Sequence, residues 1–212
     1  MAGVIRLTEE AATAFTAPST GFGVYWIDNV HSGALFLVDD TGRRWGRTHR
    51  VSVASQGAGF ATDTYLTDSG LLVPSFGFQV QTMFEWIISA SKTAAGVATP
   101  IIQVRIGTAQ TTADTSRLTF TGPAQTAAAD VGLLSVLVVV RSVNAAGVIQ
   151  GHASWNHNGA AAGFANNDAG AVEATSAAFD NTALSSNFVG LSINGGASAA
   201  WTVTQSRAAA IW

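Results

Sequence analysis

The chain has 212 residues, of which only 11% are charged, against roughly 25% in ordinary soluble domains. Its net charge of −3 and its single lysine, Lys92, argue against the basic surface that nucleic-acid-binding proteins need. The lack of cysteine excludes disulfide bonds and thiolate metal sites, and the longest apolar run, residues 131–140, is about half as long as a membrane-spanning helix.

The first 20 residues mix alanine and threonine with weak periodicity. We interpret them as an extended arm that docks on another molecule. Arg6, Glu9 and Glu10 lie where a signal peptide would have its apolar segment, so we expect no signal peptide.

Two short strands are predicted next, at residues 22–27 and 34–38. A turn at residues 28–33 joins them, and a second turn follows at residues 39–42. Such a small β-meander is only marginally stable by itself.

The basic cluster of the chain follows the meander, with four arginines around Trp45 and His49. Guanidinium groups suit ion pairs at interfaces, so we expect these arginines to pair with Asp39, Asp40 or carboxylates of a neighbouring subunit. A phosphate or nucleic-acid contact is the alternative. The candidate interaction residues are Trp26, Arg43, Arg44, Trp45, Arg47 and Arg50.

Residues 55–64 are predicted to be a flexible connection, because their glycines allow backbone conformations that other residues avoid. We place a domain boundary there. Residues 1–62 form the arm and meander, and residues 63–212 form the main domain.

The main domain contains eight β-type segments and no convincing amphipathic helix. This pattern predicts an all-β fold, a jelly-roll-like β-sandwich. The segment 78–90 is long enough to bend and serve both sheets, and the small-residue stretch 159–182 is expected to hold an extra strand at residues 171–175. The eight segments are residues 71–73, 78–90, 101–106, 117–120, 133–143, 148–156, 187–193 and 201–205.

The segment 133–143 is the strongest strand signal, because it is rich in β-branched valine. Its apolar character has no clean alternation. We therefore predict a central strand with both faces buried, so that aspartate at either Val138 or Val139 would abolish folding.

Two stretches resemble virion surface proteins of tailed bacteriophages. They are TAPSTGFGVYWIDNVHSGALFLVDDTGRRW, residues 16–45, and VRIGTAQTTADT, residues 104–115. In those proteins a hairpin with an aromatic strand and an Asp-Asp-Thr-Gly turn precedes a jelly-roll-like sandwich. The resemblance implies a structural protein without enzymatic activity, typically a homotrimer, that decorates the capsid or belongs to a tail or head fibre.

Several residues were considered for catalysis or metal binding. His152 and His157 are five positions apart, which places them on opposite faces of a strand and argues against a shared metal. Asp114 and Asp130 precede strands, where aspartate bonds to turn backbone, although a glycosidase pair is the alternative. Glu85 is expected to face solvent or to pair with Arg105 or Arg141. Most of the six tryptophans are expected in the core or at an interface, with a sugar platform as the alternative.

The low charged fraction has two explanations: Ser, Thr, Asn and Gln cover the surface, or other subunits bury part of it. We predict a non-enzymatic capsid decoration or cement protein, a homotrimer without cofactors, at the virion surface after assembly in the host cytoplasm. Its expected partners are the major capsid protein or other virion subunits, with no nucleic acid or membrane. A fibre component that binds a host receptor or surface glycan is the alternative, and a polysaccharide-degrading enzyme is a third.

Overall fold

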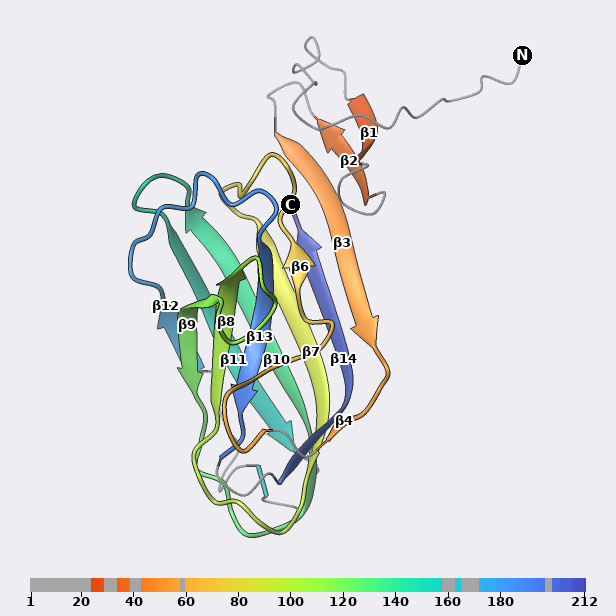
Figure 1. Ribbon diagram of the computed structural model, residues 1–212, viewed down its shortest axis with the longest axis vertical. Helices are drawn as coiled ribbons and strands as arrows, with labels where there is room; N and C mark the ends of the chain where they lie inside the picture. Colours follow the sequence, from red (N-terminus) through yellow and green to blue (C-terminus); the bar gives the residue numbers. More distant parts are fainter. Residues whose placement is uncertain are drawn as a thin grey trace, which may run out of the picture.

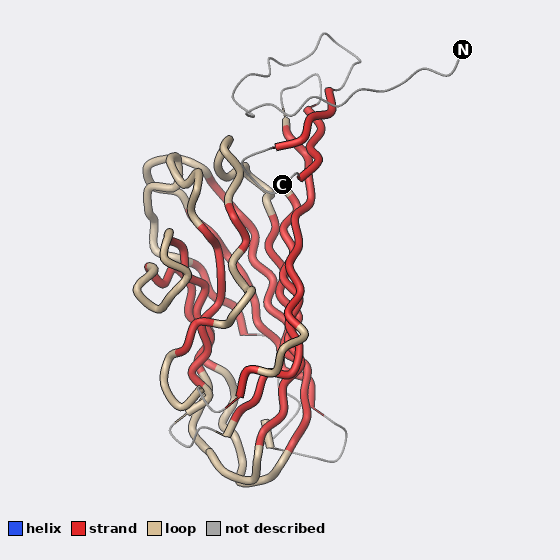
Figure 2. Tube along the Cα trace, turned by 45° about the vertical axis from the view of Figure 1, so that its right-hand side comes forward, coloured by secondary structure: helices blue, strands red, loops and turns tan. Residues whose placement is uncertain are grey.

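The computed structural model describes residues 24–28, 34–38, 43–57, 60–157, 163–164, 172–196 and 200–212. These residues form two antiparallel β-sheets that pack against each other, with no helix among them (Figures 1 and 2). The predicted all-β sandwich is confirmed. Its jelly-roll character stays a prediction.

The larger sheet has the strand order β1-β2-β3-β14-β7-β10-β11-β12, and the short strand β4 also pairs with β14. Its strands are β1 (Val24–Asp28), β2 (Ala34–Val38), β3 (Arg44–Ser52), β4 (Gln56–Gly57), β7 (Met83–Lys92), β10 (Asp130–Ser142), β11 (Val148–His157), β12 (Val172–Thr175) and β14 (Trp201–Ile211).

The smaller sheet has the order β5-β13-β8-β9, with β6 also paired to β13. Its strands are β5 (Thr64–Tyr65), β6 (Leu71–Leu72), β8 (Ile101–Gly107), β9 (Thr115–Thr121) and β13 (Phe188–Asn194). β13 and β8 lie in front of β7, β10 and β11 in Figure 1.

The core lies between the two sheets and follows from alternation along the strands. In β7 every second side chain, from Phe84 to Lys92, is buried, because successive residues of a strand point to opposite faces. Phe78, Phe84 and Trp212 form an aromatic cluster, in which the Phe84 and Trp212 rings meet edge-on with centroids 5.3 Å apart. Edge-on contacts of this kind stabilise beyond simple burial of area.

Most predicted strands agree with the structure to within a few residues, and the predicted short strand at 171–175 corresponds to β12. The prediction for residues 78–90 is wrong in two respects. β7 begins only at Met83, since Gln81 has a positive φ of 73° and the Gln79 N–H donates to the Thr82 hydroxyl instead of a strand partner. β7 also pairs only with β10 and β14, both in the larger sheet.

The basic segment after the meander is a strand, which the sequence reasoning missed. Residues Arg44 to Gly46 of β3 pair with β2, and Arg47 to Ser52 pair with β14 of the sandwich. The presumed flexible connection at 55–64 also holds β4 and the start of β5. The meander and the sandwich therefore share one continuous sheet, and the domain boundary after residue 62 stays a prediction.

β10 lies centrally, between β7 and β11, as predicted. Val136, Val138 and Val140 on one face are fully buried. On the other face Val131 is 59% exposed and Leu133 is 40% exposed. The prediction that both faces are buried is therefore wrong for the single chain.

Candidate interaction surface

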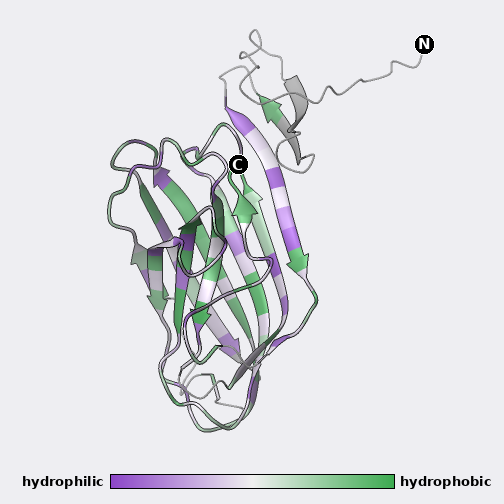
Figure 3. Ribbon diagram, in the orientation of Figure 1, coloured by the Kyte–Doolittle hydropathy of each residue, from purple (hydrophilic) through white to green (hydrophobic). Residues whose placement is uncertain are grey.

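β3 carries most of the predicted interaction residues and presents them on two faces. Trp45, Arg47 and His49 are exposed and alternate with the half-buried Arg44 and Thr48. Figure 3 shows β3 as mainly hydrophilic beside the more hydrophobic β14. The exposed set therefore gives one edge of the larger sheet a positive surface.

Arg43 and Arg44 make contacts with aromatic rings. The Arg43 guanidinium lies 3.9 Å from the centre of the Trp45 ring, and that of Arg44 lies 5.2 Å from the Phe76 ring. Gln79 also bonds to both backbone groups of Arg44, at 3.1 Å and 2.8 Å. Arg44 thus has a structural role at the start of β3.

The other predicted members of the site are only partly placed. Arg47 and Arg50 are exposed, Arg50 on the opposite face of β3 from Arg47. The backbone of Trp26 pairs with Phe36 in the β1–β2 hairpin, but its side chain lies outside the described residues. The proposed partners Asp39 and Asp40 also lie outside them.

The outward face of the larger sheet is the face that points away from the smaller sheet. Strand register places the outward side chains of β14, β7, β10 and β11 in rows across the sheet. Two such rows are Ile211-Met83-Val139-Gln150 and Arg207-Ile87-Ser135-Ser154. We call this surface the outer face; its apolar side chains lie mainly on β7 and β10.

Glu85 lies near the middle of the outer face and forms an ion pair with Arg207 of the neighbouring strand β14. Both side chains are about 40% exposed. The prediction that Glu85 faces outward is confirmed, but the two partners considered, Arg105 and Arg141, are wrong. Arg207 lies 122 residues further along the chain, so local sequence gave no indication of it.

A groove of about 510 Å³ opens on the outer face beside β11 and β12. Leu137 and Val139 form part of its apolar lining, and Arg141, His152 and Glu173 add polar groups. The Arg141 guanidinium bonds to the side chain of Gln150. No group of three or more potential metal-ligating side chains occurs among the described residues.

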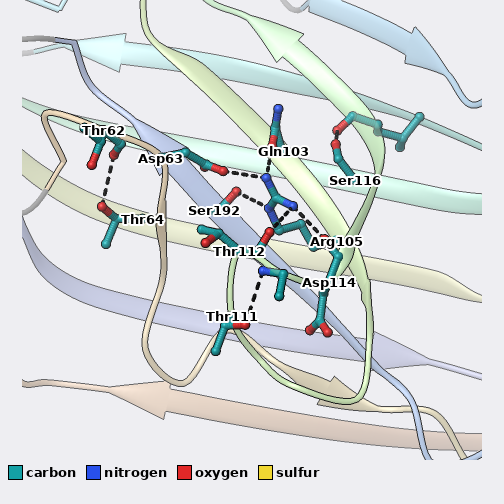
Figure 4. A network of polar contacts seen from close by, with 12 residues as sticks. Thr62, Asp63, Thr64, Gln103, Arg105, Thr111, Thr112, Asp114, Ser116 and Ser192 are labelled. Carbon is teal, nitrogen blue, oxygen red and sulfur yellow. Dashed lines mark hydrogen bonds and ion pairs between the residues drawn. The ribbon is translucent and has the colours of Figure 1, made fainter.

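Arg105 lies at the centre of a buried polar network (Figure 4). From the sequence, Arg105 was considered only as a partner for Glu85. Its side chain points away from the core of the sandwich yet is only 8% exposed. Its guanidinium group has five N–H donors, and the structure supplies five acceptors. They are the Ser192 hydroxyl at 2.7 Å, the Thr112 carbonyl at 2.9 Å, the Asp114 carbonyl at 2.6 Å, the Asp63 carboxylate and the Gln103 side chain.

Both candidate catalytic aspartates accept hydrogen bonds from backbone N–H groups, Asp114 within a turn, as the preferred interpretation predicted, and Asp130 partly from a segment 34 residues away. The Asp114 carboxylate accepts hydrogen bonds from the backbone N–H groups of Ala109 and Gln110, at 2.9 Å and 2.8 Å. Asp130 accepts from Val131 and Phe164 in the same way, at 2.8 Å and 3.0 Å. These contacts account for both carboxylates without catalysis.

Lys92 is buried at the end of β7 and donates to three backbone carbonyl groups, of Thr93, Thr126 and Ala128, at 2.7 to 3.2 Å. Burial lowers the pKa of Lys92, and the nearby Asp130 carboxylate partly opposes this change. The only lysine of the sequence therefore connects the end of β7 to the loop before β10, and its side chain is buried.

Four of the six tryptophans are in the core, namely Trp86, Trp155, Trp201 and Trp212. This confirms the preferred interpretation for these four. Trp45 is 41% exposed on β3, where it contacts Arg43. Among the tryptophans with described side chains, Trp45 alone could offer a ring to a partner or a sugar.

Comparison with known proteins adds no identification. No protein-family model matches the chain, and no curated protein matches it. No helix in the described part of the chain has the length and apolar character needed to cross a membrane.

Proposed function

We propose that the chain is a structural virion protein of a tailed bacteriophage, a homotrimeric decoration or cement protein on the outer capsid. It has no enzymatic role in this proposal. The resemblance of residues 16–45 and 104–115 to virion surface proteins supports it. The structural observation that carries it is the continuous sheet that extends from the sandwich through β3 into the β1–β2 hairpin.

The hairpin lies beyond the end of the sandwich in both views (Figures 1 and 2). β1 is the last strand of the larger sheet among the described strands. A sheet edge of this kind can pair with an extended segment of another protein, and nearby arginines can bind its carboxylates. The sandwich then covers the shell while the hairpin anchors it.

A fibre component that contacts the host receptor is the second candidate. The groove beside β11 and β12 favours it, because apolar lining with Arg141, Gln150 and His152 is suited to a small polar ligand such as a glycan. Electron cryomicroscopy of intact particles separates the two functions. Hundreds of copies over the shell support decoration, whereas a few copies at one vertex support a fibre.

A binding experiment tests the anchoring role of the hairpin. Protein lacking residues 1–42 retains β3 and β4, and thus the whole described sandwich. It should fold but should not bind particles from which the native protein is missing. Binding equal to that of the full chain would contradict the proposed anchor.

The arginines of the anchor can be tested separately in the full chain. Replacing Arg43 and Arg50 together by glutamine should weaken particle binding. Arg141→Gln is the matched control, since Arg141 is exposed but distant from the hairpin in strand order. Equal effects of the two variants would contradict a specific role of the β3 arginines.

A further inference from the structure

Exposed apolar side chains are concentrated on one side of the molecule. Among the described residues, eight large hydrophobic side chains are exposed, and six of them lie on or beside the outer face. Single exposed hydrophobic residues are normal, but a grouped set indicates an interaction surface. The six are Trp45, Val51, Val80, Val131, Leu133 and Ile211.

Half-buried apolar side chains join these residues into a band along β7 and β10. Strand register places Met83 beside Val139. Glu85 and Leu137 form the next row on this face, and Ile87 lies in the row after it. Glu85 and Arg207 form an ion pair on this band, which is neutral as a pair. Covering the band would therefore leave neither of these charges unpaired.

The outermost strands of the outer face, β3 and β12, carry exposed side chains of opposite charge, and Arg141 of β10 lies in the same groove as the Glu173 of β12. β3 presents the exposed Arg47 and His49 at one edge, and β12 presents the exposed Glu173 at the other. His49, Ala209, Glu85, Leu137, His152 and Glu173 form one row across the sheet. The positive and negative edges thus lie at the same height along the strands.

We infer that the outer face is the surface through which copies of this chain associate. Three copies pack their outer faces around a three-fold axis parallel to the strands, with the β3 edge of each copy beside the β12 edge of the next. This inference deepens the homotrimer within the proposed function and rests on that function for the number of copies.

The dimensions of the face agree with three copies. Six strands, from β3 to β12, at a spacing of about 4.8 Å span about 24 Å. Three walls of that width enclose a prism with each wall about 7 Å from the axis, about 2 Å more than half of the roughly 10 Å that separates packed sheets. Side chains of the three copies can fill this space.

Charge selects the parallel arrangement. In a closed ring with parallel strands, His49 of one copy lies at the height of Glu173 of the next copy, and the Arg47 guanidinium lies one row away from it. An antiparallel pair would place β3 against β3, so that like charges face one another, which is unfavourable. The ring also places all β1–β2 hairpins at one end, where they can bind a common partner.

Cysteine cross-linking tests this geometry directly, because the natural chain contains no cysteine. The variant combines Arg47→Cys with Thr175→Cys in the full chain. These two positions lie at opposite edges of the outer face, in the same row as Met83 and Val139. Within one chain these positions are five strands apart, about 24 Å, far beyond the roughly 7 Å limit for a disulfide.

After mild oxidation, the double variant should give a covalent trimer as its largest species on a non-reducing gel. Each single variant should give almost no cross-linked product. Four outcomes would each overturn the inference. They are a covalent dimer as the largest species, a ladder of species larger than a trimer, strong cross-linking of Arg47→Cys alone, and a monomeric protein that does not cross-link.

Charge reversal provides an independent measurement on the protein without cysteine. Arg47→Glu should weaken association by roughly tenfold or more in sedimentation, and adding Glu173→Arg should restore it. Thr119→Glu on β9 is the control, since this exposed residue lies in the smaller sheet. Failure of the second change to restore association would contradict the contact between the edges.

Particle binding, measured on the same samples, separates this inference from the proposed function. A monomer that binds particles would overturn the interface and the homotrimer, but it would leave the proposed binding to the capsid intact. A trimer with the expected cross-links that does not bind particles would support the interface and contradict the function.

Discussion

Val138 and Val139 are neighbours on β10 whose side chains have opposite surroundings. Val138 is fully buried between the sheets, whereas Val139 is half-buried on the outer face. Val138→Asp should abolish folding, because an unpaired carboxylate in a dry core costs several kcal/mol, comparable to the stability of a domain. Val139→Asp should leave a folded chain, since its carboxylate reaches water in the single, unassociated chain. Urea unfolding followed by circular dichroism measures both.

The two variants control for each other, because they place the same charge one residue apart. Val139→Asp is expected to lose less than about 1.5 kcal/mol of unfolding free energy. A Val138→Asp protein with native stability would show that β10 does not pack against the smaller sheet.

Tyr65 gives the protein a sensitivity to alkaline pH. Burial, aided by the Asp114 carboxylate, raises the pKa of Tyr65 to about 12. The unfolded chain releases this proton near pH 10, whereas the folded chain retains it, so this contribution to stability is lost as pH rises from 10 to 12. Tyr65→Phe should therefore lose less stability than the natural protein between pH 8 and pH 11.

Urea unfolding at the two pH values measures this difference. Other groups that titrate in the same range are present in both proteins and cancel in the comparison. Gly190 explains the position of the ring, because a Cβ at that residue would lie only 1.9 Å from the Tyr65 hydroxyl. An identical pH dependence in both proteins would contradict the role of Tyr65.

At the scale of single elements, Arg105 holds together β8, β13, the loop before β9 and the segment before β5. Arg105→Lys keeps the charge but removes the planar group that bonds to all of them. We expect a loss of about 2 to 4 kcal/mol of unfolding free energy, because buried acceptors lose their donors.

Arg141→Lys is the matched control for that measurement, since the Arg141 guanidinium is exposed and bonds to Gln150 on the neighbouring strand. It should change stability by less than about 0.5 kcal/mol. Faster amide hydrogen exchange at residues 108–114 should accompany Arg105→Lys alone. Equal stability of the two variants would show that the network contributes little.

β3 determines where the chain can be shortened. It covers one edge of β14, the Gly46 carbonyl accepts from the Trp212 backbone N–H at 2.9 Å, and the Thr48 hydroxyl contacts the Trp212 indole at 3.3 Å. Deleting residues 1–42 should leave a soluble, cooperatively unfolding protein. Deleting residues 1–60 also removes β3 and β4, so it should cause aggregation through the uncovered edge.

Soluble yield and circular dichroism distinguish the two truncated proteins. Equal yields and equal unfolding transitions would mean that β3 is dispensable for the sandwich. That result would also support an independent domain starting after residue 62.

At the scale of the whole molecule, association through the outer face links stability to protein concentration. The thermal midpoint of the natural chain should rise with concentration, because assembly favours the folded state. Leu137→Glu, in the middle of the face, should remove this dependence while the fold persists. Thr119→Glu should retain it, and a dependence that persists in both variants would place the contact elsewhere.

The sequence by itself determined the all-β class, because β-branched and aromatic alternation and turn residues act over a few positions. It located most strands and assigned Asp114 to a turn, whose N–H donors lie within five residues. It did not predict the Phe164 donor of Asp130, which lies 34 residues away. It could not recognise β3, whose polar sequence becomes a strand only because β14 supplies hydrogen-bonding partners.

Tertiary structure alone decided which face of β10 is dry, since that depends on where the smaller sheet packs. It also decided the partners of Arg105 and Glu85, which lie as far as 87 and 122 residues away along the chain. Contacts between such distant residues leave no local pattern in the sequence. The outer face could likewise be recognised only in the tertiary structure, because its residues come from strands that lie side by side only in the folded sheet.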